Sequence, residues 1–383
     1  MTVLLDDQSN EPGTHVLLIG VGEYPFLKGG AAPEADRFAR HMEMGQLSSP
    51  PLSVEALAKW FVDANAGFDN PQRPLRSLDM LCSGNAPLTW THGGANKVVD
   101  RALTDAVVAA IPLWMERASR NPDNLAFFYF CGHGVAFDET KNALLLEDFG
   151  GNRNSPMAKA LAFDQVRLGM MNQCAARNLC FFVDACRTQP TNAFVDEFGD
   201  DNVGMSPVSG GLSRRIREKI APVFFATGLL SAAYGLRDQP SLFLQGMLRC
   251  FRGVGSRDAD THYEVVIEAI GEAINRCVES LAFQSQPQYC QPREAGFPLT
   301  IHRVRGDPEV IVKVFTRDQA QASNARLSYK SPRMQQPGFR PAPSPWWLTV
   351  PLGQYEFKAL ADNDDVISQN SRTVAPPGAQ VSL

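Results

Sequence analysis

One histidine and one cysteine stand out in this sequence because each lies just beyond a short apolar run. His133 sits between two glycines after the run Leu125 to Cys131, and Cys186 lies three residues after the run Leu179 to Val183. In an open parallel sheet, the carboxyl ends of the strands meet at one edge. If the two runs form neighbouring strands, the imidazole and the thiol reach the same edge.

These two residue types together predict nucleophilic catalysis by a thiol. A free thiol with a pKa of about 8.5 is only slightly ionised at neutral pH, so a nearby base must take its proton. We expect His133 to be the general base and Cys186 the nucleophile. The backbone amides of Gly134 and Cys186 are the expected donors to an oxyanion. We expect the glycines beside His133 to leave room for a peptide and to let the backbone turn off the strand.

The surrounding pattern predicts an α/β layered domain. Four apolar runs are typical of strands buried on both faces of a parallel sheet: His15 to Val21, Leu125 to Cys131, Leu179 to Val183 and Val223 to Ala226. Apolar residues three and four positions apart predict helices between and after them: Glu34 to Met44, Val54 to Ala64 with Ser53 as its cap, Lys97 to Ser119, Phe163 to Ala176, Ser241 to Cys250 and Tyr263 to Leu281. The alternation of strand and helix favours helices on both faces of one sheet.

The character of the chain changes near residue 306. Short alternating strands separated by Pro, Gly and Asn follow, which predicts a β-sandwich-like domain over 306–383 after a first domain over 1–305. Within the first domain, residues 188–220 are rich in Gly, Asp, Asn and Ser and then turn basic. We expect a long surface loop there, and loops of that length in compact domains are usually functional.

Composition excludes several classes of function. The net charge of −5 and the isoelectric point near 5.8 give no basic surface for nucleic acid. No apolar segment reaches the roughly 20 residues that cross a membrane, and the first residues do not resemble a secretion signal, so we expect a cytoplasmic protein. The eight cysteines lie mostly in apolar runs and should be reduced. The spacing of Cys and His predicts no metal site, and no cofactor is expected, although the sequence does not decide whether calcium is required.

The motifs around His133 and Cys186 resemble those of the caspase and metacaspase family of cysteine peptidases. They read Cys-Gly-His-Gly and Asp-Ala-Cys-Arg, with 53 positions from the histidine to the cysteine. The segment Leu17 to Ala35 is similar to the first strand and first helix start of the family, and Ala226 to Leu248 is similar to a later strand and helix. Together the resemblance covers about residues 14 to 255. It implies a caspase-like α/β/α sandwich with a mostly parallel sheet.

The differences between this chain and animal caspases concern substrate choice. Animal caspases carry Gln two positions before the cysteine and bind aspartate through arginines, whereas this chain has Asp184 there. In metacaspases the corresponding Asp and an acid of the first helix motif bind a basic residue, and Glu34 occupies that second position. Cys131 stands where metacaspases often have Ser, so we expect it to line the same substrate pocket. Two carboxylates match one guanidinium in charge and hydrogen-bonding capacity. The resemblance therefore implies an endopeptidase that cleaves after Arg, then Lys, and not after Asp. Thr188 departs from the small residue that usually follows Arg187.

The resemblance also suggests a zymogen. Relatives are often activated by cleavage of the linker after the catalytic strand, and this linker contains Arg214, Arg215 and Arg217. We expect processing there, by the enzyme itself or by an upstream protease, in a prokaryotic stress or antiviral response. Two alternatives remain open: a catalytically silent binding or scaffold module that kept the fold, and a related enzyme that acts on a non-peptide amide.

Other conspicuous residues have structural interpretations. The remaining histidines are expected to be hydrogen-bonded structural residues: His15, His41, His92, His262 and His302. Trp346 and Trp347 favour core filling in the small β domain over a ligand platform.

Overall fold

The computed structural model describes residues 1–34, 44–191, 195, 203–208, 219–229, 231, 233, 237–281, 288–296, 298–318 and 322–383. It divides into two compact units, the first comprising 1–245 with 283–299 and the second 246–282 with 300–383. The domain boundary expected between residues 305 and 306 stays a prediction.

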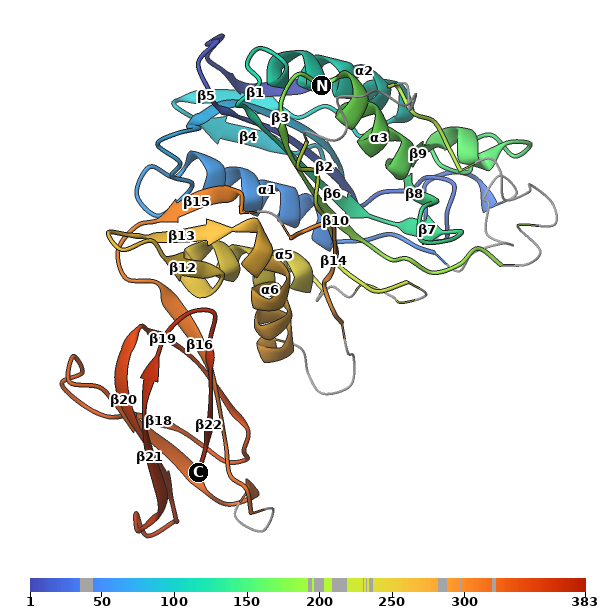
Figure 1. Ribbon diagram of the computed structural model, residues 1–383. Helices are drawn as coiled ribbons and strands as arrows, with labels where there is room; N and C mark the ends of the chain where they lie inside the picture. Colours follow the sequence, from blue (N-terminus) through green and yellow to red (C-terminus); the bar gives the residue numbers. More distant parts are fainter. Residues whose placement is uncertain are drawn as a thin grey trace. The chain divides into compact units, whose positions relative to one another are not determined.

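A seven-stranded sheet forms the centre of the first unit (Figure 1). Its strand order is β1-β3-β2-β6-β10-β11-β14. The five inner strands are parallel, and an antiparallel strand lies at each edge. The bounds are β1 Thr2–Asp6, β2 Thr14–Val21, β3 Leu75–Ser83, β6 Leu125–Gly132, β10 Asn178–Ala185, β11 Val223–Phe225 and β14 Gln291–Arg293. The four predicted strands are therefore confirmed as β2, β6, β10 and β11.

Helices cover both faces of this sheet (Figure 1). Phe127 and Phe182 stack on each other, and Phe127 meets Phe61 of α1 (Ser49–Val62). The next residues along the strands point the other way: Phe128 meets α2 (Thr104–Ala118) and α3 (Phe163–Gln173). Continuous apolar runs are needed because neither face of the sheet is exposed.

Two predicted helices begin at different residues. Helix α1 begins at Ser49, so Ser53 lies buried inside it instead of capping it. Helix α2 begins at Thr104, because residues before it form a hairpin of β4 (Thr89–His92) and β5 (Ala95–Val98). The helix predicted over Glu34 to Met44 falls almost entirely outside the described residues.

A small three-stranded sheet lies beyond β6. It comprises β7 (Gly134–Ala136), β8 (Asn142–Leu145) and β9 (Ala160–Ala162) in antiparallel order. A bridge between Val135 and Thr188 joins β7 to the backbone just after Cys186. This sheet therefore supports the segment that follows β10.

The second unit is rich in β-structure, as predicted. A sandwich encloses Val312, Trp346 and Phe357 between a three-stranded and a four-stranded sheet. Its strands are β16 (Glu309–Phe315), β17 (Arg326–Lys330), β18 (Gly338–Arg340), β19 (Trp346–Pro351), β20 (Gly353–Leu360), β21 (Val366–Val374) and β22 (Ala379–Ser382). The unit also holds β12 (Ser256–Asp258), β13 (Tyr263–Val266), β15 (Thr300–Val304) and helix α6 (Ile267–Leu281). The helix predicted from Tyr263 thus begins four residues later, after a strand.

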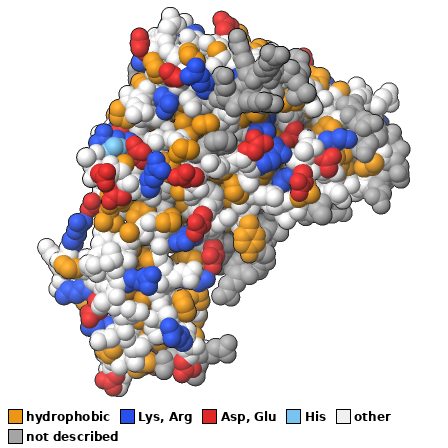
Figure 2. All heavy atoms as spheres, in the orientation of Figure 1, with side chains coloured by type: hydrophobic (Ala, Val, Ile, Leu, Met, Phe, Trp, Pro, Cys, Tyr) orange, Lys and Arg blue, Asp and Glu red, His pale blue; other side chains and the backbone are white. Residues whose placement is uncertain are grey.

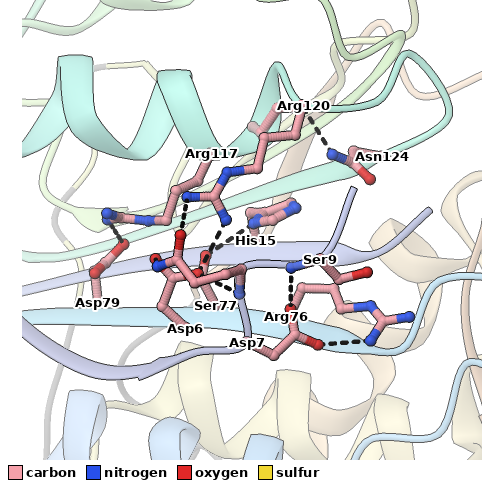
Figure 3. A network of polar contacts seen from close by, with 12 residues as sticks. Asp6, Asp7, Ser9, His15, Arg76, Ser77, Asp79, Arg117, Arg120 and Asn124 are labelled. Carbon is pink, nitrogen blue, oxygen red and sulfur yellow. Dashed lines mark hydrogen bonds and ion pairs between the residues drawn. The ribbon is translucent and has the colours of Figure 1, made fainter. Parts of the chain in front are cut away.

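A network of polar contacts ties β1 and β3 to helix α2 (Figure 3). The buried carboxylate of Asp79 accepts a hydrogen bond from Arg117, and the His15 ring lies 2.9 Å from the Ser77 hydroxyl through Nδ1. Burial lowers the pKa of His15 to about 4, so the ring is neutral at physiological pH. The network holds strands and helix together, which agrees with the structural interpretation of His15.

Candidate active site

The two candidate catalytic residues leave neighbouring strands side by side. Strands β6 and β10 pair in parallel over their full length, and Gly132 lies opposite Ala185. His133 directly follows the last residue of β6, and Cys186 directly follows the last residue of β10. The adjacency on which their joint role depends is therefore present.

His133 is held by two anchors at the end of β6. Its backbone N–H donates to the Tyr24 hydroxyl at 2.8 Å, and its ring packs against the Tyr24 ring with centroids 4.8 Å apart. Its Nε2 lies 2.7 Å from the carbonyl oxygen of Gly45. A carbonyl oxygen can only accept, so Nε2 carries the proton. In the neutral ring, Nδ1 is then the atom that can accept a proton.

Burial also favours the basic form of this histidine. Desolvation lowers the pKa of His133 below its ordinary 6.5, and the hydrogen bond to Gly45 opposes this only in part. The imidazole is therefore neutral at pH 7, which is the state that a general base needs.

Cys186 differs from the other cysteines in exposure. All eight cysteines are free thiols, and only Cys186 is partly exposed while seven are buried. The backbone N–H of Ala233 donates to its sulfur at 3.2 Å. Burial raises the pKa of Cys186 above its ordinary 9.0, so the thiol is protonated at pH 7. A base must remove this proton before the sulfur can attack.

The glycines beside His133 are also required by packing within the protein. A Cβ at residue 132 would stand 2.8 Å from the Tyr24 hydroxyl, and a Cβ at Gly134 would stand 2.9 Å from the carbonyl oxygen of Cys186. Glycine is required here because Tyr24 and the backbone of Cys186 approach closely. The room expected for a peptide substrate stays a prediction.

Asp184 lies in a buried polar cluster two residues before Cys186. The Tyr129 hydroxyl donates to its Oδ2 at 2.8 Å, and the Ser241 hydroxyl donates to the same oxygen. Cys131 lies opposite Asp184 in the strand register and hydrogen-bonds with it. Ser241 also accepts from the backbone of Leu244 at 3.0 Å, which caps the first turn of α5 (Leu242–Arg249). Asp184 and Cys131 are thus neighbours, as expected.

The Asp184 carboxyl is buried at a cost. It is 3% exposed, and desolvation raises its pKa to about 6, although hydrogen bonds from Ser241, Tyr129 and Cys131 oppose the shift. At pH 7 it is mostly ionised. Among the described residues, no lysine or arginine forms an ion pair with it. A buried carboxylate without an ion-pair partner is energetically costly.

Of the remaining candidates, only Glu34 lies in the described part of the chain. Glu34 is exposed, and among the described residues nothing joins it to Asp184 by a hydrogen bond or ion pair. Its role stays a prediction. Arg214, Arg215 and Arg217, together with most of the loop 188–220, lie outside the described residues. In the described ranges, no three side chains of His, Cys, Asp or Glu gather closely enough to hold a metal ion.

Sequence reasoning missed several residues of this site. Tyr24 and Gly45 anchor His133, while Tyr129 and Ser53 surround the acidic cluster. Tyr129 could have been found, because residues two apart on a strand share a face and Cys131 was already a candidate. The carbonyl of Gly45 carried no signal, because any residue type supplies the same group.

The fold and site define an α/β protein that presents a thiol and an imidazole at the carboxyl edge of a parallel sheet. A family model described as the caspase domain matches residues 14–295. The chain therefore belongs to the caspase domain family. Membership confirms the expected fold and suggests cysteine peptidase activity. No helix among the described residues combines the length and apolar character that a membrane crossing requires.

Individual similarities are more distant. The chain is 29% identical over 143 residues to "Uncharacterized protein y4kE" of Sinorhizobium fredii (strain NBRC 101917 / NGR234), and the match spans 34% of this chain and 40% of that protein. Protein GSU0716 from Geobacter sulfurreducens is structurally similar with a TM-score of 0.40 and 15% identity, covering 75% of this chain and 95% of that one. Caspase-1 from Spodoptera frugiperda gives a TM-score of 0.40 and 11% identity, covering 76% and 90%.

Proposed function

We propose that the chain is a cysteine endopeptidase that cleaves proteins after Arg, and second after Lys. His133 Nδ1 takes the proton of Cys186, and the thiolate attacks the carbonyl carbon before the scissile bond. The imidazolium then gives this proton to the leaving amine as the C–N bond breaks. Water hydrolyses the thioester and restores the free thiol. The amides of Gly134 and Cys186 are the proposed donors to the oxyanion.

The buried carboxylate of Asp184 is the observation that carries the basic specificity. In a regular strand, residues two positions apart point to the same face. Cys186 and His133 therefore continue on the side of Asp184 and Cys131. A substrate guanidinium next to the thiol would neutralise the carboxylate, whereas a substrate aspartate would place a second negative charge beside it. Glu34 is the second carboxylate of this proposal, as the resemblance to metacaspases implies.

We also propose activation by cleavage. It rests on the three arginines of the loop 188–220, a sequence that an enzyme of basic specificity could cut. Lys219, beside them, donates to the carbonyl oxygen of Cys174 and so has a structural contact of its own. Replacing only Arg214, Arg215 and Arg217 with Ala should prevent processing and activation. An unchanged fragment pattern and unchanged activity in this variant would contradict activation by cleavage.

The cellular location and the biological setting are also part of the proposal. We place the protein in the cytoplasm and its activity in a prokaryotic stress or defence response, with an upstream protease as a possible partner besides its protein substrates. This setting is suggested by the resemblance to stand-alone prokaryotic relatives.

The function is tested with fluorogenic peptides that carry Arg, Lys or Asp before the leaving group. Wild type is assayed both intact and after limited proteolysis, and the processed sample should cleave the Arg peptide fastest and the Asp peptide not at all. Cys186→Ala should be inactive on all three. Asp184→Asn should lose the preference for Arg while keeping the reactive thiol. A folded, processed protein without activity on any peptide would favour the scaffold alternative.

A further inference from the structure

Arg187, the residue after the candidate nucleophile, is anchored through its side chain. It is 4% exposed. Its Nε donates to the side-chain oxygen of Asn142 on β8 at 3.0 Å, and its Nη1 donates to that of Gln291 on β14 at 2.5 Å. Its guanidinium lies over the ring of Phe225, 4.2 Å from the centroid. Three separate elements therefore fix one side chain.

A second arginine approaches the same aromatic ring from the edge strand. Arg293 on β14 lies 5.3 Å from the Phe225 centroid and pairs with Asp164 at 2.6 Å. Asp164 in turn accepts from the Asn142 side chain at 2.8 Å. The two arginines repel each other, and the shared ring and this acid offset the repulsion. The contacts form a ring in which each side chain touches the next: Arg187, Asn142, Asp164, Arg293 and Phe225.

This cluster connects β14, at the edge of the sheet, to the residue next to Cys186. Strand β14 is three residues long and is paired only with β11. Burying a guanidinium is costly unless its donors are satisfied, so the hydrogen bond to Gln291 helps to hold Arg187 in this position. The Arg187 backbone N–H also donates to Ser231 at 3.1 Å, which fixes the peptide unit next to Cys186. Arg187 thus contacts the edge strand through its side chain and Ser231 through its backbone.

We propose that Arg187 is a positioning residue for Cys186, and that docking of β14 through Gln291 sets the alignment of the sulfur with His133. The proposal rests on Cys186 being the nucleophile. It makes an edge strand far along the chain part of the reactive site. Arg187 does not touch the substrate, and it acts by holding the residue before it.

The rate of alkylation of Cys186 by iodoacetamide tests this without peptidase activity. The other seven cysteines are buried, so mass spectrometry of the labelled peptide reports on Cys186. Arg187→Lys keeps the charge but loses the planar fork that reaches two acceptors. Gln291→Ala removes one acceptor from an exposed position, so this variant should fold. Each should slow alkylation about tenfold, because small displacements of reacting atoms have large effects on rate.

Two further variants separate positioning from stability. In a double-mutant cycle, Arg187→Lys with Gln291→Ala should be no slower than Arg187→Lys alone, and Gln291→Glu, which keeps an acceptor, should restore the rate. Arg117→Lys is the matched control. Arg117 on α2 is also a buried arginine and donates to Asp79 of β3, and none of its described contacts reaches the cluster around Arg187. It should lower the melting temperature and leave the alkylation rate unchanged.

The outcomes distinguish this proposal from the proposed function. Where peptides are cleaved, Arg187→Lys and Gln291→Ala should lower kcat and leave KM within about twofold. If wild type cleaves no peptide but the variants still alkylate slowly, the peptidase proposal fails and positioning stands. Wild-type alkylation in folded Gln291→Ala would overturn positioning. So would additive effects in the cycle, or an equal slowing in Arg117→Lys.

Discussion

Substituting Asp184 with Asn should change how stability depends on pH. The fold raises the pKa of this carboxyl from 3.8 to about 6, chiefly by desolvation. Between these values the folded protein keeps a proton that the unfolded chain has lost. Stability from this group is therefore complete below the unfolded pKa and is lost as pH rises through the folded pKa. Asn does not titrate, so the variant does not lose stability at this position as pH rises.

The magnitude follows from the size of the shift. The rise in the pKa of Asp184 from 3.8 to about 6 corresponds to about 3 kcal/mol, because one pH unit is equivalent to about 1.4 kcal/mol. The stability of Asp184→Asn relative to wild type should thus rise by about 3 kcal/mol between about pH 4 and about pH 8. The new amide N–H groups cost about 1 to 3 kcal/mol if they find no acceptor. That cost is the same at every pH and cancels in the comparison.

Urea unfolding at a series of pH values measures this difference. The fit should allow one transition for each compact unit, because a two-unit chain need not unfold in a single step. Asp148→Asn is a control of opposite sign. Burial raises the pKa of Asp148, but hydrogen bonds from Thr104 and Lys159 outweigh this and lower it overall. The stability that Asp148 contributes should be lost as pH falls, so this variant should approach wild type in acid.

A relative stability of Asp184→Asn that does not vary with pH would refute the reasoning. It would mean that the carboxyl has an ordinary pKa in the folded state. The buried, uncompensated charge would then not exist, and the argument for basic specificity would lose its main support.

Three further predictions concern catalysis. In steady-state kinetics, kcat/KM for an Arg peptide should fall below about pH 6, because Asp184 takes up a proton and loses its attraction for the cation. Tyr24→Phe removes the hydroxyl that accepts from the backbone of His133, so it should lower kcat severalfold and reduce stability by about 1 kcal/mol, measured by kinetics and urea unfolding. Gly134→Ala places a Cβ 2.9 Å from the Cys186 carbonyl oxygen and should lower both the melting temperature and the alkylation rate.

The sequence predicted the inner strands well because burial on both faces leaves long apolar runs. Strand β3 was missed although it lies beside β2. Its residues Arg76, Ser77 and Asp79 interrupt the apolar pattern, and partners that are distant in sequence compensate them, including Arg117 on α2 and His15 on β2. A window of neighbouring residues cannot identify such partners.

The reactive pair was predictable for a similar reason, because a motif at the end of an apolar run marks the carboxyl edge of the sheet. Its supports were less visible. Ser241 reaches Asp184 across 57 positions, and Gln291 reaches Arg187 across 104. Neither residue type is unusual in its local context. The sequence shows that Asp184 lies two positions before Cys186. Only the strand register shows which side chains surround the Asp184 carboxyl.

Asp184 and Arg187 lie three positions apart and carry opposite charges, yet they do not neutralise each other. Asp184 faces the side of α1 and α5, whereas Arg187 lies over Phe225, whose ring packs against Phe163 of α3 on the opposite side. Neutral acceptors on β8 and β14 satisfy Arg187 and keep it away from the acid. Arg187 therefore does not compete with the basic substrate residue that the proposed function assigns to Asp184. If this separation is correct, Arg187→Lys should lower kcat without moving the fall in kcat/KM near pH 6, and a shift of that limb would show that the two charges interact.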